Sequence, residues 1–147
     1  MRVFPAAAGV RIEMRLKPAQ INARLEIELC DAAGRRPLRV AFAEDGRVQA
    51  ADGDSVVGVG TYAAGEWVTL CLTADLAAGA CAVQVNGGAS KRLAVAAKGV
   101  RNMERLSLRT GAWRGCGDSS GVEAKTDVPM AKPAVFHLDG VTLCPLR

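Results

Sequence analysis

The chain has 147 residues, of which 50% are hydrophobic, so it is long enough to bury one core and too short to expect two domains. Its formal net charge is +4, and its 19 basic residues are spread among 15 acidic ones without a long run, which argues against a nucleic-acid-binding tail. No apolar stretch reaches the ~20 residues that a membrane-spanning helix needs. We therefore expect neither a nucleic acid nor a membrane as a partner.

The N-terminal half of the chain is predicted to form a series of strands. Residues 1–8 hold a short apolar run with no cleavage region behind it, so no signal peptide is predicted. Residues 10–17 alternate apolar and charged side chains up to Pro18, as a strand with one buried face requires. Similar apolar patterns predict four more strands, at residues 25–30, 38–42, around Val48, and 56–59.

The segment 61–88 is predicted to form the β-hairpin around which the other strands assemble. Residues 67–73 alternate apolar and more polar side chains, and residues 81–85 repeat the pattern. The sequence Asn86-Gly87-Gly88 then supplies residues that accept positive φ angles in a turn.

The remaining sequence continues the same pattern. Strands are predicted at residues 93–95, 105–109 and 134–143, and a long surface loop at residues 115–132, which are rich in Gly, Ser, Asp and Pro. Turn signals recur about every ten residues and no helical period is present. We predict an all-β, antiparallel two-sheet β-sandwich, with residues 1–147 as a single domain that is either complete or an excerpt of a longer protein.

The apolar phases of these strands predict the core. The residues expected there are Leu25, Ile27, Leu70, Leu72, Val83, Val85, Leu106, Leu108, Phe136 and Leu138.

The cysteines and the histidine suggest no metal centre and no catalytic site. The five cysteines contain no C-x-x-C pair, and Cys71 and Cys81 lie on opposite phases of neighbouring strands, so free thiols are expected. His137 is the only histidine, and it shares a strand face with Asp139, but no G-x-S-x-G sequence accompanies them. We interpret His137 as a polar-face residue and assign no catalytic residue or metal ligand.

Several short motifs carry a family resemblance. The sequence Gly60-x-Tyr62-x-x-Gly65-x-Trp67 opens the hairpin, Asp75 follows its first strand, and Val85-Asn86-Gly87 ends it; residues 105–111 and 136–143 complete the pattern. With these motifs the chain resembles the concanavalin A-like lectin/glucanase superfamily and its laminin G-like jelly-roll domains. The resemblance is strongest to the accessory modules of bacterial carbohydrate-active proteins.

The resemblance implies two curved antiparallel sheets, a ligand groove on the concave one, and an extracellular or periplasmic location. It also implies that Trp67 helps to close the sandwich, whereas Trp113, beside the long loop, is expected to be exposed. No cofactor is predicted, although some relatives bind calcium through loop carboxylates. Because the spacing of the loop acids matches no standard calcium loop, we expect them to be solvated turn residues; they are Asp52, Asp54, Asp118 and Asp127.

Residues 26–30 invite comparison with an enzyme. Glycosidases of the resembled fold present three acids at alternating positions of one strand, and Glu26 and Glu28 match the first two. Cys30 stands where the third acid is needed. With Arg24 beside them, the two glutamates are expected to form a charge-paired strand face.

The polar phases of the strands supply the candidate ligand-binding residues. If the first strand, the last strand and the 105–109 strand share a sheet, as the resemblance implies, their charged side chains form one outward face. Arginine forks there suit the carboxylate or sulfate groups of an acidic glycan, and the alternative is a solvated face held by ion pairs. The candidates are Arg11, Arg15, Arg24, Glu26, Glu28, Arg105, Arg109, Trp113 and His137.

Three functions follow from this reading. The first is a non-catalytic carbohydrate-binding or accessory module, with a carbohydrate as its partner. The second is a glycoside hydrolase or polysaccharide lyase of the same fold, and the third is a structural or protein-interaction sandwich without a sugar site.

Overall fold

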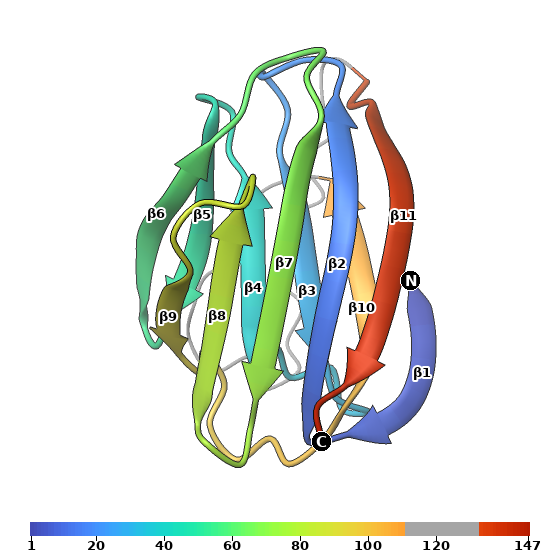
Figure 1. Ribbon diagram of the computed structural model, residues 1–147, viewed down its shortest axis with the longest axis vertical. Coiled ribbons are helices and arrows are strands. Elements are labelled where there is room, and N and C mark those ends of the chain that lie inside the picture. Colours follow the sequence, from blue (N-terminus) through green and yellow to red (C-terminus); the bar gives the residue numbers. More distant parts are fainter. Residues whose placement is uncertain (111–132) are drawn as a thin grey trace.

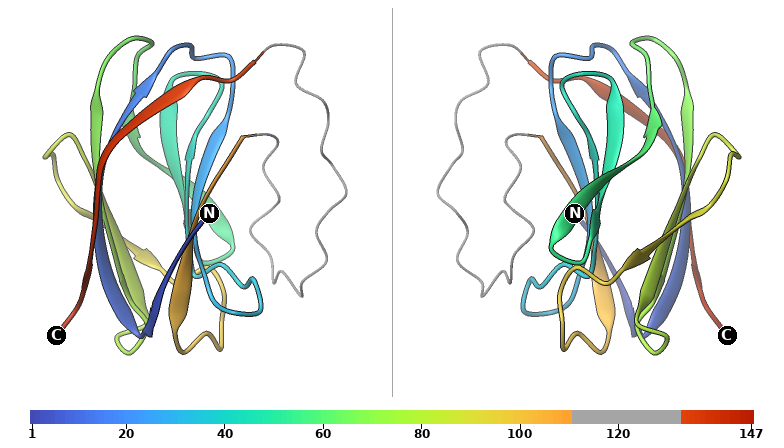
Figure 2. Two further views of the ribbon diagram at one scale, coloured as in Figure 1. Left: turned by 90° about the vertical axis from the view of Figure 1, so that its right-hand side faces the viewer. Right: turned by 90° about the vertical axis from the view of Figure 1, so that its left-hand side faces the viewer.

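The computed structural model describes residues 1–110 and 133–147, which form two β-sheets packed face to face (Figure 1, Figure 2). The six-stranded sheet has the order β1(Arg2–Ala7), β10(Met103–Thr110), β3(Leu25–Cys30), β4(Leu38–Phe42), β5(Arg47–Asp52) and β6(Ser55–Thr61). The five-stranded sheet has the order β11(Phe136–Pro145), β2(Gly9–Pro18), β7(Val68–Asp75), β8(Ala80–Val85) and β9(Lys91–Ala94). Neighbouring strands within the described residues are antiparallel, which confirms the predicted all-β sandwich. Within these residues, no helix has the length and apolar character to cross a membrane.

The predicted strands are present, and one strand was not predicted. β2 shows the expected alternation, because its apolar residues are buried while Arg11, Glu13 and Arg15 are exposed. The unpredicted strand is β1, whose Pro5 and alanine-rich sequence show no period of two. It pairs with β10 through a register that shifts between Val3 and Ala7.

The predicted hairpin is formed by β7 and β8. Their register places Leu70 opposite Val85 and Asp75 opposite Ala80. Asn86 and Gly87 have φ angles of 51° and 68°, as the turn requires. The Asn86 side chain also accepts a hydrogen bond from the Thr69 backbone N–H at 2.9 Å, which ties the turn to the start of β7.

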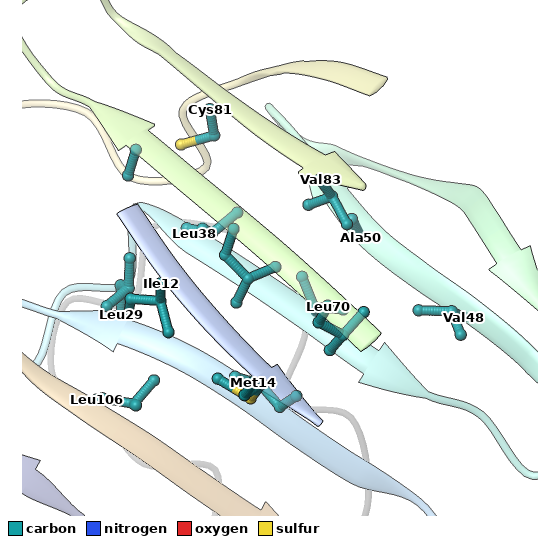
Figure 3. Close-up of a cluster of buried hydrophobic side chains, with 14 of the residues drawn as sticks. Ile12, Met14, Leu29, Leu38, Val48, Ala50, Leu70, Cys81, Val83 and Leu106 are labelled. Atoms are coloured by element: carbon teal, nitrogen blue, oxygen red, sulfur yellow. The ribbon is translucent and has the colours of Figure 1, made fainter. Parts of the chain in front are cut away.

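The core fills the space between the sheets, and Figure 3 shows side chains from both sheets meeting there. Most of the predicted core is confirmed: Leu25, Ile27, Leu70, Leu72, Val83 and Leu106 are buried, and Val85, Leu108 and Phe136 pack against the core while partly buried. The prediction that Leu138 belongs to the core was wrong, because this residue is 47% exposed. It lies on the edge strand β11, where a neighbouring strand covers one side only.

Three aromatic rings join the core to its rim. The Phe42 ring lies 4.9 Å from the Tyr62 ring and 6.3 Å from the Phe136 ring, centroid to centroid. The Tyr62 hydroxyl donates a hydrogen bond to the Ala43 carbonyl oxygen, and burial raises the pKa of Tyr62 to about 12. The hydroxyl therefore stays protonated and keeps this bond at every physiological pH.

The assignment of strands to sheets differs from the sequence prediction. β2 and β11 pair in the five-stranded sheet, whereas β10 lies between β1 and β3 in the six-stranded sheet. The expected single charged face is therefore divided between the two opposite outer surfaces of the sandwich. The pairing of β10 with β3 buries apolar residues of both strands in the core, among them Leu106 and Ile27.

Candidate functional site

The outer phase of the six-stranded sheet carries a group of buried charges, which we call the Glu26 network. It consists of Glu26, Glu28, Arg36, Arg39 and Arg109. The Arg109 Nη2 atom lies 2.6 Å from Glu26 Oε2, and the Arg39 guanidinium lies 3.9 Å from Glu26 Oε2 and 3.6 Å from Glu28 Oε1. Arg36 Nε lies 3.8 Å from Glu28 Oε1.

The burial of this network contradicts the expectation that Glu26 and Glu28 project into solvent. Glu26 is 1% exposed, Glu28 is 2% exposed, and Arg39 is 2% exposed. Burial raises the pKa of Glu26, and the hydrogen bond from Arg109 acts in the opposite direction. Alternation predicted correctly that these side chains point away from the core, but it carries no information on what covers an outer face. The network joins β3, β4 and β10 through charge pairs.

The outer face of the five-stranded sheet is different, because its charged side chains are accessible. Arg11 pairs with Glu13 at 2.6 Å, and both side chains are about half exposed, at 52% and 53%. Arg15 Nη1 lies 3.3 Å from Asp139 Oδ2, again between exposed side chains. Such exposed pairs contribute roughly 0 to 1 kcal/mol each and exchange partners readily.

An exposed tryptophan lies beside these charges. Trp67 precedes β7 and is 40% exposed, with the Arg15 guanidinium carbon 4.7 Å and the Lys17 Nζ 5.4 Å from its ring centroid. Lys17 is opposite His137 in the β2–β11 register, and Arg15 is opposite Asp139. We call Arg15, Lys17, Trp67, His137 and Asp139 the Trp67 platform.

The platform corrects the expectation that Trp67 closes the sandwich. The signal for its exposure was present in the sequence, because Val68, Leu70 and Leu72 point inward and the residue before Val68 therefore points outward. Lys17 was not among the predicted site residues. It lies on the same charged face of β2 as Arg11 and Arg15, which represent that face in the prediction. Asp139 was considered only as a partner of His137.

The other predicted site residues do not join the platform. Arg24 forms an ion pair with Glu44 at 3.0 Å, near the start of β3. Arg105 lies on β10 and is 3.6 Å from Glu104. Arg11 lies on the same sheet face as the platform, but it pairs with Glu13 nearer the start of β2. Trp113 falls outside the described residues.

The acids and cysteines of the described residues give no metal centre. No cluster of three or more His, Cys, Asp or Glu side chains in residues 1–110 and 133–147 is arranged to hold a metal ion. Asp52, one of the loop acids, accepts a hydrogen bond from the Ala94 backbone N–H at 2.7 Å. Asp118 and Asp127 lie outside the described residues. Cys71 and Cys81 are free thiols, as expected, and burial raises the pKa of Cys81 to about 12.

The comparisons with known proteins agree with this architecture. Residues 1–125 match a family model described as "Sialidase-like, CBM domain", in which CBM stands for carbohydrate-binding module. No curated protein sequence matches the chain significantly.

Solved structures show the same fold. One is a sialidase, with a TM-score of 0.80 and 22% identity over 98% of this chain, which spans only 14% of that protein. A toad ovary galectin in complex with thio-digalactose has a TM-score of 0.58 and 11% identity, covering 93% of this chain and 90% of the galectin. An alginate lyase from Alteromonas sp. 272 has a TM-score of 0.55 and 14% identity, covering 97% of this chain and 74% of the lyase. These likenesses concern the fold, which is an antiparallel two-sheet β-sandwich in this chain.

Proposed function

This chain belongs to the sialidase-like CBM domain family, and we propose that it is a non-catalytic carbohydrate-binding module that recognises an acidic glycan through the Trp67 platform. The observation that carries the proposal is the exposed indole of Trp67 with two cationic side chains against it on an accessible sheet face. The resembled family and the sugar complexes of galectins of the same fold support carbohydrate as the ligand class.

The platform has the chemistry that such recognition needs. An indole stacks on the apolar C–H face of a sugar ring and remains partly wet at its edge. The Arg15 fork and the Lys17 ammonium suit a carboxylate or sulfate on the same sugar or its neighbour. Asp139 and His137 offer groups that hydrogen-bond hydroxyls. Because the Arg15–Asp139 pair is exposed and 3.3 Å long, a ligand anion can replace Asp139 at little cost.

We further propose that the module serves a larger extracellular or periplasmic protein. The sialidase of similar fold is much longer than this chain, which spans 14% of it. An accessory module in such a protein would hold the polymer near a separate catalytic domain and raise the local substrate concentration.

The first test of the platform is the Trp67→Ala variant, measured by affinity electrophoresis or calorimetry on uronate-containing and sialic acid-containing glycans. We expect affinity to fall about tenfold, which corresponds to ~1.4 kcal/mol of lost stacking. The melting temperature should stay nearly unchanged because Trp67 is 40% exposed and lies outside the core. Lys17→Ala should weaken binding less, and the loss should shrink at high salt.

The matched control is Arg92→Ala. Arg92 is an exposed cation on β9 of the same sheet, opposite Ala82 and away from the platform. Arg92→Ala removes the same net charge as Lys17→Ala. If both variants weaken binding equally, the ligand is attracted by the overall positive charge and not bound at the platform. Unchanged binding in Trp67→Ala, or no binding of the parent protein to any glycan at low salt, would contradict the proposal.

The absence of catalysis is a separate expectation. Glu26 and Glu28 are buried and tied to arginines, and Cys30 occupies the third position of the acid pattern. We expect no reducing ends to be released from β-glucans, galactans or uronate polymers. Measurable release of reducing ends would overturn this expectation. If Glu26→Gln or Glu28→Gln abolished that release, the active site would lie on β3.

A further inference from the structure

One end of the sandwich contains a second feature, built on Arg35. The loop between β3 and β4 holds Asp31 and Arg35, and the loop between β9 and β10 holds Gly99, with both loops at the same end of the molecule (Figure 2). The Arg35 backbone N–H and Nε–H donate to the two oxygens of Asp31 at 2.8 Å and 2.7 Å. Arg35 Nη1 also donates to the Gly99 carbonyl oxygen at 3.3 Å. The guanidinium is therefore held in one orientation and joins the two loops.

Two hollows adjoin this fixed guanidinium. The first, of about 370 Å³, is lined by residues of both loops, among them Arg35, Arg101 and Asn102, together with Ala6 of β1 and Glu104 of β10. The second, of about 500 Å³, is lined by Arg35, Gly53, Asp54, Val95, Ala96 and Lys98. We call the first hollow the Arg35 pocket. Its volume lies within the range of small-molecule sites, about 300 to 1,000 Å³.

The charges around the Arg35 pocket favour an anionic group. Asp31 is 7% exposed, and both of its oxygens accept from Arg35, so these two charges compensate each other and Arg101 supplies the excess positive charge. Glu104 lies 3.6 Å from Arg105. In the part of the chain that the structure describes, Arg101 has no ion pair or side-chain hydrogen bond, and its side chain is exposed at the pocket. Arg35 is 40% exposed at its side chain, which leaves part of the fork accessible.

We propose that the Arg35 pocket is a second ligand site, separate from the Trp67 platform, that binds a single carboxylate-bearing sugar unit. Arg35 and Arg101 hold the carboxylate, and the fixed Arg35 fork binds it with little loss of side-chain freedom. Asn102 supplies an amide that both donates and accepts, as sugar hydroxyls require. The small side chains of Ala6, Ala32 and Ala33 leave room for the ring and contact its apolar face.

The Arg35 pocket lies at the loop end of the sandwich and shares no residue with the Trp67 platform, so it adds a second site to the proposed function. The flat platform suits an internal segment of a polymer, whereas a pocket suits one unit, such as a chain end. The two sites can therefore fail independently. The experiment below distinguishes binding at the platform alone from binding at the pocket alone.

The test uses sodium galacturonate as the probe, followed through backbone amide chemical shifts of the whole chain. We expect the shifts to change most at Gly34, Gly99 and Asn102. Arg101→Ala should lower the affinity about tenfold, and Arg35→Lys should lower it as well because the fork is lost while the charge remains. Trp67→Ala and Arg92→Ala should leave the shifts at these three amides unchanged.

Two comparison ligands decide whether a sugar is recognised. Galactose, which lacks the carboxylate, should bind far more weakly, and sodium acetate should bind more weakly because it lacks the ring. Equal shifts with acetate would overturn the sugar assignment. Unchanged affinity in Arg101→Ala, shifts confined to the Trp67 platform, or no shifts with galacturonate at low salt would overturn the site itself. Arg101→Ala should keep the parent melting temperature, since Arg101 is exposed.

Discussion

Replacing Arg109 by alanine should destabilise the domain by about 3 kcal/mol at neutral pH. Arg109 donates the 2.6 Å hydrogen bond to Glu26, which is 1% exposed, so its removal leaves a buried carboxylate with weaker compensation. The expected loss is at the lower end for buried pairs because Arg39 still lies 3.9 Å from the same oxygen. Urea denaturation of both proteins at pH 7 measures the difference.

The loss should depend on pH in a defined direction. Burial raises the pKa of Glu26 above that of the unfolded chain, so the folded protein holds this proton more tightly. The contribution of Glu26 to stability is therefore most favourable below the unfolded pKa, roughly 4.3, and falls as pH rises through the raised folded value. Arg109 opposes this fall by stabilising the ionised carboxylate. The gap between parent and Arg109→Ala should widen from pH 4 to pH 7.

The matched control is Arg105→Ala, on the same strand and phase. Arg105 lies 3.6 Å from Glu104, and both side chains are about one-third exposed, at 33% and 29%. Its loss should cost less than about 1 kcal/mol and change little with pH. An equal and pH-independent loss in both variants would show that Glu26 is not ionised in the folded protein.

Replacing Phe42 by alanine should have the largest effect on stability, about 3 to 5 kcal/mol. Phe42 is fully buried at 0% exposure and contacts both Tyr62 and Phe136, so the variant leaves a cavity between the sheets. It also removes the support for β11, whose Phe136 packs against the core. Thermal unfolding followed by circular dichroism measures the loss.

Phe42→Leu provides the comparison. It keeps most of the volume and should cost clearly less than the alanine variant. A similar cost for both would mean that the aromatic contacts, rather than the cavity, determine stability at this position. A small cost for both would contradict the central place of Phe42 in the core.

Local pattern explains the parts of this protein that the sequence predicted. The period of two in β2 and β7 follows from alternating side-chain directions in a strand, so it predicts the buried residues without knowledge of the partners. The Asn86-Gly87 turn is likewise a local property, because its φ angles belong to those residues alone. Because Val68, Leu70 and Leu72 point inward, the same alternation predicts that Trp67 points outward. The family resemblance led to the opposite expectation.

The candidate site could be predicted only in part. Arg15 and His137 were identified as outward residues, and both lie on the Trp67 platform. Arg109 and Glu26 were identified with the same reasoning, but they lie on the opposite sheet and are largely buried. The Arg35 pocket was not predicted, because neither of its two loops carries a repeating pattern that indicates which other loop it will meet.

The strands other than β1, the hairpin turn and the inward or outward phase of most side chains could be predicted from the sequence, since these depend on neighbours in the chain. Which strands share a sheet, and which outer face stays accessible, became known from the packed fold. Arg15 and Asp139 are 124 positions apart, and Arg109 and Glu26 are 83 apart. Such contacts arise from the packing of the whole core, because alternation specifies that a side chain points outward but not which strand pairs beside it or what covers it.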